Sequence, residues 1–207
     1  MSEIDHSKLR AQPETEDFAG KYENEGAIAS YLVNKYFEAV ARLLKKTEGV
    51  DTAHEIGAGE GRSTTLLRKL VPNLSASEFV EHLVPRAQEN NPDLKVFQES
   101  VYELKYQDDQ VDLVFLLEVL EHLDHPEIAL KEIKRISKKY LILGVPREPL
   151  WCFLNMARFK YLKDFGNTPG HLNHWSKRSL IKLIEEKYGK VIAVENPIPW
   201  TIVLVES

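Results

Sequence analysis

The sequence predicts an α/β protein with a doubly wound, mostly parallel sheet of seven strands and an antiparallel last strand pair. Strand-like segments alternate with helical segments along most of the chain, which is the pattern of βαβ units. Two strand segments, residues 111–117 (VDLVFLL) and 140–145 (YLILGV), are continuous apolar runs, as expected of strands buried on both faces. The last two strand segments are joined by NPIPW, which is too short for a crossover helix, so they are expected to pair antiparallel.

The first half of the chain opens with an amphipathic helix at about residues 25–46. Val33, Phe37, Val40 and Leu44 recur there at helical spacing, with charged residues between them. After this helix we expect strands at 50–56, 74–79 and 93–98 and helices at 62–70 and 82–90.

The second half continues the alternation. A helix at 126–137 connects the fourth strand, 111–117, to the fifth, 140–145. A further helix at 176–188, with Ser176 as its N-cap, precedes the last two strands at 190–195 and 201–206.

Length and composition favour a single domain. With 207 residues, of which 43% are hydrophobic, the chain can bury one sizeable core. Residues 1–20 are polar and are expected to form a flexible lead-in, with one domain over 21–207.

Charge and cysteine content argue against several functional classes. The net charge is −5, and no long basic run is present, which argues against a nucleic-acid partner. Cys152 is the only cysteine, so intramolecular disulfides and four-thiolate metal sites are excluded, and a reducing, cytoplasmic compartment fits best. No apolar run approaches about 18 residues, so we expect neither a signal peptide nor integral membrane association.

The stretch HEIGAGEG, residues 54–61, follows the first expected strand and places Gly57, Gly59 and Gly61 at alternate positions. A tight turn needs one or two such glycines, whereas three favour a ligand that approaches the bare backbone. In open α/β sheets ligands bind at the carboxyl ends of the strands, which is where this stretch lies. A dinucleotide fingerprint would place its third glycine where Arg62 stands.

EIGAGEG resembles motif I of the class I S-adenosylmethionine-dependent methyltransferases, in which an acidic residue, here Glu55, precedes alternating glycines. The resemblance is to the small-molecule, type 11 kind, and it covers about residues 25–207. It implies a Rossmann-like fold, S-adenosylmethionine as methyl donor and S-adenosylhomocysteine as product. It also implies donor contacts from Glu55, Gly57, Ala58, Gly59 and Gly61.

The resemblance assigns further donor contacts to the ends of the second and third strands. Glu78 takes the place of the acidic residue that binds the ribose hydroxyls, and Phe79 would lie against the adenine. Ser100 stands where the family usually has aspartate, so adenine contacts would pass to its hydroxyl or to Glu99. Val101 offers its backbone amide to the ring.

The segment LLEVLEHL, residues 116–123, resembles the family's segment after the fourth strand. By that resemblance Leu117 and Glu118 would face the ammonium group of the donor's methionine moiety. Glu121 and His122 lie one turn further on and would point to the acceptor. A charged capping turn without a catalytic role explains these last two residues equally well.

Residues 147–175 form an insertion after the fifth strand, and we interpret it as a lid or acceptor segment. A helix over 150–163 would carry two apolar stripes, one of them Cys152, Met156 and Phe159. This second stripe is either buried as a cover or lines an apolar acceptor pocket. His171 and His174 end the segment, and with His122 they are the candidate catalytic bases, since an imidazole pKa near 6.5 suits proton removal at neutral pH.

The sequence therefore predicts methyl transfer to a small-molecule acceptor, apolar or lipid-like. The attacked atom and the oligomeric state stay open. No metal site is expected, because the histidines lack a spacing such as H-E-x-x-H. Two alternatives remain: a nicotinamide-dependent oxidoreductase, opposed by Arg62 and by the lack of a Tyr-x-x-x-Lys pair near the fifth strand, and a catalytically inactive donor-binding module.

Overall fold

The structure is a computed structural model that describes residues 4–5, 9–11 and 26–207. Most of the lead-in expected at residues 1–20 therefore lies outside the described residues. The strands are β1 (Ala53–Ile56), β2 (Leu74–Glu78), β3 (Val96–Gln98), β4 (Val111–Leu117), β5 (Ser137–Pro146), β6 (Lys190–Glu195) and β7 (Trp200–Glu206). The helices are α2 (Ala27–Leu44), α3 (Arg62–Leu67), α4 (Val84–Asn90), α5 (Pro126–Ile136), α6 (Leu150–Ala157) and α7 (Lys177–Lys187), with short 3-10 turns η3 (Glu81–Leu83), η4 (Leu120–His122) and η5 (Leu162–Asp164).

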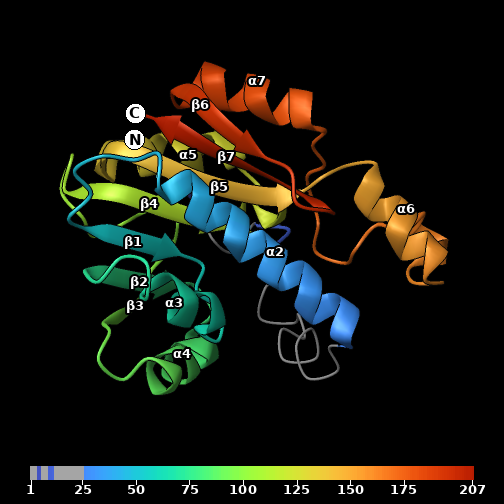
Figure 1. The fold of residues 1–207 in the computed structure, drawn as a ribbon, viewed down its shortest axis with the longest axis horizontal. Coiled ribbons are helices and arrows are strands. Elements are labelled where there is room, and N and C mark those ends of the chain that lie inside the picture. The colour runs from blue at the N-terminus through green and yellow to red at the C-terminus, as the bar shows by residue number, and fades with distance from the viewer. Residues whose placement is uncertain (1–3, 6–8, 12–25) are drawn as a thin grey trace.

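The predicted sheet is confirmed. Its seven strands are ordered β3-β2-β1-β4-β5-β7-β6 (Figure 1). Strands β1 to β5 pair in parallel, whereas β7 pairs antiparallel with both β5 and β6. The short connection between β6 and β7 thus reverses the chain, as its length required.

Two apolar clusters cover the two faces of the sheet. On one face, α5 and α7 pack their buried leucines and isoleucines on Val114, Leu116 and Leu143. On the other face, Tyr36, Val40 and Leu43 of α2 and Leu67 of α3 pack against Leu113, Phe115 and Ile142. Residues 113–117 of β4 alternate between the two clusters, which explains why this part of the strand is apolar without interruption. The result is a three-layer arrangement with the sheet in the middle (Figure 1).

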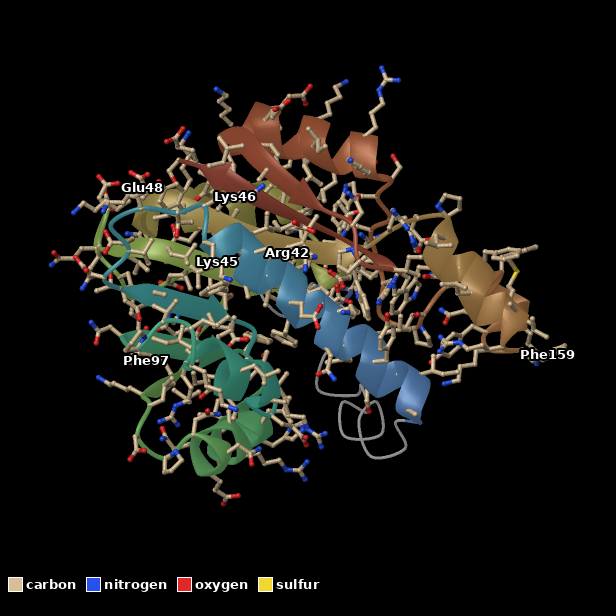
Figure 2. The ribbon with its side chains drawn as sticks, in the orientation of Figure 1. Arg42, Lys45, Lys46, Glu48, Phe97 and Phe159 are labelled. Atoms are coloured by element: carbon tan, nitrogen blue, oxygen red, sulfur yellow. The ribbon has the colours of Figure 1, made fainter. Side chains whose placement is uncertain are left out.

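Polar contacts tie the outer surface of the helices to the sheet and mark where helices begin. On α2, Arg42 forms hydrogen bonds of 3.2 and 2.8 Å with the carboxylate of Glu195 in β6, and its side chain is half exposed (Figure 2). The predicted N-cap of α7 is confirmed, since the Ser176 hydroxyl accepts a hydrogen bond from the Ser179 amide at 3.2 Å. In the part of the chain that the structure describes, no helix is both long and apolar enough to cross a membrane.

His54, in β1, is a fully buried imidazole that sequence reasoning did not single out. Its Nδ1 lies 2.9 Å from the Ser75 hydroxyl and 3.0 Å from the Tyr106 hydroxyl, and its Nε2 lies 3.0 Å from the Ser77 hydroxyl. Burial lowers the pKa of His54 from 6.5 to about 3, only partly offset by a hydrogen bond to Ser75. The ring is therefore neutral in the folded protein at any pH above this value.

We expect His54→Gln to change how stability depends on pH. Below pH 6.5 the unfolded chain protonates His54 and the fold does not, so His54 makes the fold less stable as the pH falls from 6.5 towards 3. Neighbouring Glu55 has the opposite effect on stability. Burial raises its pKa from 4.5 to about 7, so the stability that its protonated form contributes is present below pH 4.5 and is lost as the pH rises from 4.5 to 7.

Of the two pH-dependent contributions to stability, from His54 and Glu55, the variant keeps only that of Glu55. As the pH falls from 6.5 to 4.5, the unfolding free energy of the parent should therefore decrease relative to that of the variant, by up to about 1.4 kcal/mol for each pH unit. Urea unfolding at half-unit pH steps measures both curves. Parallel curves for parent and variant would show that His54 is not held neutral.

Candidate active site

The glycine stretch lies at the switch point of the sheet. Strands β1 and β4 are neighbours, with Ile56 paired to Leu116 near their carboxyl ends. The chain leaves β1 for α3, which covers one face, and leaves β4 for η4 and α5, which cover the other. In open α/β sheets, ligands bind at such a point, in a crevice outside the carboxyl ends of the strands, so we expect the ligand here.

All three glycines have left-handed backbones, with φ of 79° at Gly57, 56° at Gly59 and 80° at Gly61. Two of them are also sterically required. A Cβ at Gly57 would lie 2.4 Å from a methyl group of Val119, and one at Gly61 would lie 2.6 Å from the Asn91 amide nitrogen. A Cβ at Gly59 would meet nothing within 4 Å. The middle glycine therefore faces open space, as expected where a ligand approaches the backbone.

Glu78, at the end of β2, is tied to this loop. One carboxylate oxygen accepts a hydrogen bond from the Gly59 amide at 2.7 Å, and the other accepts one from the Val80 amide at 2.8 Å. Burial raises the pKa of Glu78, although these amide bonds work in the opposite direction. Phe79 is the first residue after β2, and its side chain is partly exposed. The carboxylate of Glu78 is thus an acidic acceptor bonded to the Gly59 amide, and Phe79 is the next residue in the chain.

Glu55 lies beneath the loop with only 1% of its surface exposed. It accepts a hydrogen bond of 2.5 Å from the Thr64 hydroxyl in α3. This bond joins the end of β1 to the helix that follows the glycines. Its position indicates a role in holding the loop's shape, in addition to any contact with the donor.

The end of β3 meets that of β2 through the Glu99 amide, which donates to the Glu78 carbonyl at 3.1 Å. The Ser100 hydroxyl, in the place of the family's aspartate, accepts a 3.3 Å hydrogen bond from the Tyr102 amide. The side chain of Val101 is buried in the core beneath α5. Ser100 and Val101 therefore follow the carboxyl end of β3, where the resemblance to the family places the adenine contacts.

The end of β4 is held by a contact that the sequence did not reveal. Glu118 has a left-handed backbone with φ of 59°, and its amide donates to the Gly144 carbonyl in β5 at 2.9 Å. Its carboxylate accepts a 2.8 Å hydrogen bond from the Trp200 indole nitrogen. Leu117, just before it, is nearly buried. Trp200 begins β7, so this contact depends on the antiparallel pairing of β5 with β7.

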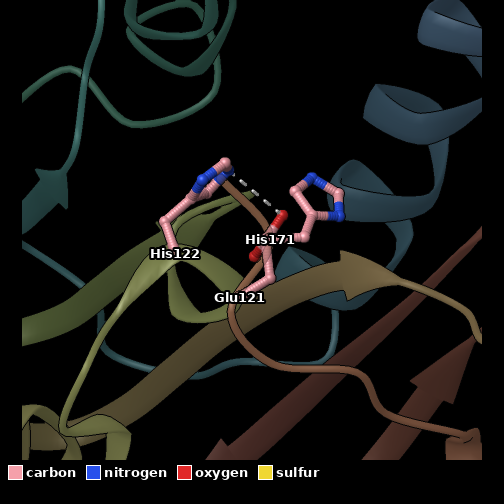
Figure 3. A group of neighbouring side chains, drawn as sticks. All are labelled: Glu121, His122 and His171. Atoms are coloured by element: carbon pink, nitrogen blue, oxygen red, sulfur yellow. Dashed lines mark ion pairs between the residues drawn. The ribbon is translucent and has the colours of Figure 1, made fainter. Parts of the chain in front are cut away.

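Glu121, His122 and His171 come together at the carboxyl end of β4 (Figure 3). A carboxylate oxygen of Glu121 lies 4.0 Å from Nε2 of His122, and the two imidazole rings are edge to face with their centres 4.9 Å apart. Glu121 and His171 are buried, and His122 is partly exposed. Local spacing gave no hint of this group, because His171 comes from the segment after β5.

His174 lies apart from this group, which separates two histidines that the sequence had treated as one pair. Its Nδ1 is 3.2 Å from a carboxylate oxygen of Glu148, and the same oxygen accepts a 3.3 Å hydrogen bond from the Cys152 thiol. Burial, and then the Glu148 carboxylate, raise the pKa of Cys152 to about 11. The thiol is therefore protonated at neutral pH and is not a nucleophile.

The helix predicted over 150–163 is wrong in its second half. Helix α6 ends at Ala157, and Phe159 and Tyr161 have left-handed backbones with φ of 57° and 52°. The reason is a contact outside the helix: the buried side-chain amide of Asn155 donates to the Gly166 carbonyl at 2.9 Å. The chain after Ala157 therefore turns back towards α6. Phe159 is consequently off the helix and 84% exposed, at the outer end of this segment (Figure 2).

An apolar groove of about 570 Å³ runs along α6, and its walls are Pro149, Leu150, Cys152, Phe153, Met156 and Phe165. The helix lies beyond the carboxyl end of β5 (Figure 1). From the same helix the ring of Trp151 lies 5.9 Å from that of His171 and 6.0 Å from that of Trp200. Aromatic contacts thus connect the groove's helix to the groups at the end of β4.

The N-terminal segment also reaches this edge of the sheet. Asp124, just after η4, accepts hydrogen bonds from the Arg10 and Ala11 amides at 3.0 and 2.9 Å and from the Arg10 side chain at 3.0 Å. Although burial alone would raise the pKa of Asp124, these bonds outweigh it and keep the pKa below its usual value. Arg10 and Ala11, in the predicted lead-in, therefore contact the loop that follows η4.

The family comparison finds a match to the model described as "Methyltransferase domain" over residues 54–142, from β1 into β5. Comparison with curated proteins finds no match.

Several solved structures share the fold. A SAM-dependent methyltransferase from Aquifex aeolicus is 20% identical, with a TM-score of 0.70 over 92% of this chain and 98% of that chain. The magnesium protoporphyrin IX methyltransferase from Synechocystis, solved with bound SAH, is 12% identical, with a TM-score of 0.68 over 91% of each chain. A Haloferax volcanii methyltransferase solved in complex with the Trm112 methyltransferase activator is 15% identical, with a TM-score of 0.66 over 86% of this chain and 92% of that chain.

The matched residues contain the glycine loop, Glu78 and the end of β4. The oxidoreductase alternative finds no support in this match. Residues 54–142 therefore match a methyltransferase domain, and this match, the shared fold and the glycine loop support S-adenosylmethionine-dependent methyl transfer with S-adenosylmethionine as the cofactor.

Proposed function

We propose that this methyltransferase acts on a small-molecule acceptor with a large apolar part, which binds between the carboxyl end of β4 and the segment 147–175. The observation that carries the proposal is the apolar groove on α6 together with the aromatic contacts of Trp151. Phe153, Phe159 and Phe165 are 63%, 84% and 82% exposed. Large apolar side chains gathered on one surface mark a binding site for an apolar ligand.

For the donor we propose contacts from residues near the carboxyl ends of β1 to β4: Glu55, Gly57, Ala58, Gly59, Gly61, Glu78, Phe79, Ser100, Val101, Leu117 and Glu118. The open space at Gly59 supports a backbone contact there. The carboxylate of Glu78 keeps lone pairs beyond its two amide bonds, which suits two vicinal ribose hydroxyls. Glu118, fixed by Trp200, offers negative charge to an ammonium group.

For methyl transfer, the main role of the protein is to position the donor and the acceptor. S-adenosylmethionine supplies an electrophilic methyl group: an acceptor lone pair bonds to the methyl carbon, the carbon–sulfur pair stays on sulfur, and any acceptor proton is released. Residues of this chain hold the two reactants in line and exclude water. We propose that His122 and His171 face the acceptor, whereas the ring of His174 is engaged with Glu148.

We propose that residues 21–207 act as one domain, with 147–175 as its acceptor segment. The continuous sheet and its two apolar clusters support this view. A cytoplasmic setting is proposed on the presence of a single cysteine, Cys152.

Substitutions in the groove should separate acceptor use from donor binding. We expect Phe153→Ala and Met156→Ala to leave the Kd for S-adenosylmethionine within about three-fold and to lower kcat/KM for the acceptor by about ten-fold or more, because each removes apolar contact area. Ile128→Ala, which truncates an exposed side chain on α5, is the matched control.

The acceptor is found first, by incubating the parent protein with labelled donor and a metabolite extract. Transfer of label to a small apolar compound supports the proposal. Label that never leaves the donor would favour the inactive donor-binding module. Undiminished transfer by the groove variants would place the acceptor elsewhere.

A further inference from the structure

Glu121, His122 and His171 have the arrangement of a metal-binding group. Each offers one ligand atom, and these atoms all lie within 4.8 Å of one another. Three ligands that surround a single ion at bond lengths of about 2.0–2.2 Å are separated by about 3–4 Å, so small side-chain rotations bring the three onto one ion. Figure 3 shows the three side chains converging from η4 and from the segment after β5.

The backbone that carries these ligands is fixed independently of any ion. The Glu121 carbonyl accepts hydrogen bonds from the Leu172 amide at 2.9 Å and the Asn173 amide at 3.0 Å. The Asn173 side chain donates to the Leu123 carbonyl at 2.7 Å. These bonds lock the residue after His171 to η4, so the two ligand segments hold a constant separation. Such outer contacts are what keep metal ligands in position.

We propose that Glu121, His122 and His171 bind one divalent transition-metal ion, of which Zn²⁺ and Mn²⁺ are the leading candidates. Two imidazoles and one carboxylate are a ligand set that zinc and other first-row divalent ions accept. Three protein ligands leave further positions open, which is the pattern of a catalytic rather than a structural site. The negative carboxylate compensates part of the ion's charge in a largely buried place.

The role of the ion rests on the proposed function. The site adjoins the end of β4 and the ring of Trp151, where we place the acceptor. An ion held by these three residues would act as a Lewis acid: it would accept a lone pair of an acceptor hydroxyl and lower the pKa of that hydroxyl, whose proton would pass to water. The acceptor class is then an apolar compound that carries a hydroxyl group. His122 and His171 act in this scheme as ligands and not as bases.

Direct metal titration tests the site without donor or acceptor. Protein treated with chelator is titrated with Zn²⁺ and Mn²⁺ by calorimetry, and with Co²⁺ while its visible absorption is recorded. We expect about one ion for each chain. Glu121→Gln and His171→Asn should each weaken binding by at least about 100-fold, since loss of a ligand costs no less than loss of an outer partner.

Two control variants locate the ion. His125→Ala removes an exposed imidazole close to the group and should leave metal affinity unchanged. His174→Ala tests the group formed by Glu148, Cys152 and His174, whose ligand atoms are similarly close. Loss of binding with His174→Ala, and not with His171→Asn, overturns the proposal, as does the absence of binding by the parent.

Donor binding is measured on the same variants to keep the two proposals apart. If the parent protein binds S-adenosylmethionine but no metal ion, the metal site is refuted and the proposed methyl transfer is not. Metal binding that leaves methyl transfer to the hydroxyl acceptor unaffected keeps the site and refutes its role in the reaction. Circular dichroism of each variant confirms that the fold is retained.

Discussion

Replacing Gly59 by asparagine is expected to weaken S-adenosylmethionine binding by at least about 100-fold, or about 2.7 kcal/mol, while the protein stays folded. Gly59 has φ of 56°, a conformation that asparagine tolerates better than other residues with a side chain. The added side chain would occupy space that is open in the structure and that we assign to the donor. Valine would block the same space, but it would also strain the loop, so asparagine gives the clearer test.

Calorimetric titration with the donor measures the effect. Gly49→Asn is the matched control, because Gly49 has φ of 59° but precedes β1, at the opposite end of the strands. A Cβ there meets only the flexible end of Lys139. Equal donor affinity in the parent and in Gly59→Asn would show that the open space at this glycine is not the donor site.

Glu78→Ala is expected to weaken donor binding by about 1.5–3 kcal/mol, or about 10- to 150-fold, the scale of hydrogen bonds to a charged group. Two effects act in the same direction. The ribose loses its acceptor, and the Gly59 and Val80 amides lose the carboxylate that holds them. The glycine loop is then less well fixed in the conformation that the donor requires.

Glu78→Gln separates the two effects. Its single carbonyl oxygen can accept from only one of the two amides, so we expect donor affinity between that of the parent and that of Glu78→Ala. NAD serves as a second ligand in the same titrations, and it should bind far more weakly than S-adenosylmethionine to the parent protein. Unchanged donor affinity in both variants would remove Glu78 from the site.

Local pattern was sufficient for the parts of the fold that depend on neighbouring residues. The apolar run of β4 follows from burial on both faces. The spacing of Val40 and Leu44 in α2 follows from one apolar stripe that packs on the sheet, with Val40 buried and Leu44 partly buried. The short link before β7 required an antiparallel turn. Where a distant contact intervened, local pattern failed: α6 ends at Ala157 because Asn155 bonds to Gly166, which no periodicity reveals.

The sequence by itself determined that this protein has an α/β sheet with a glycine loop after its first strand. The signals for strands, turns, helices and the alternating glycines each depend only on residues that are close together in the sequence. The sequence also indicated the donor. Only the tertiary structure decided how the far side of the site is assembled. Trp200 reaches Glu118 because β7 lies beside β5, and His171 joins Glu121 because the segment after β5 returns to η4. These contacts depend on strand order and loop closure, which bring together residues that no local spacing relates.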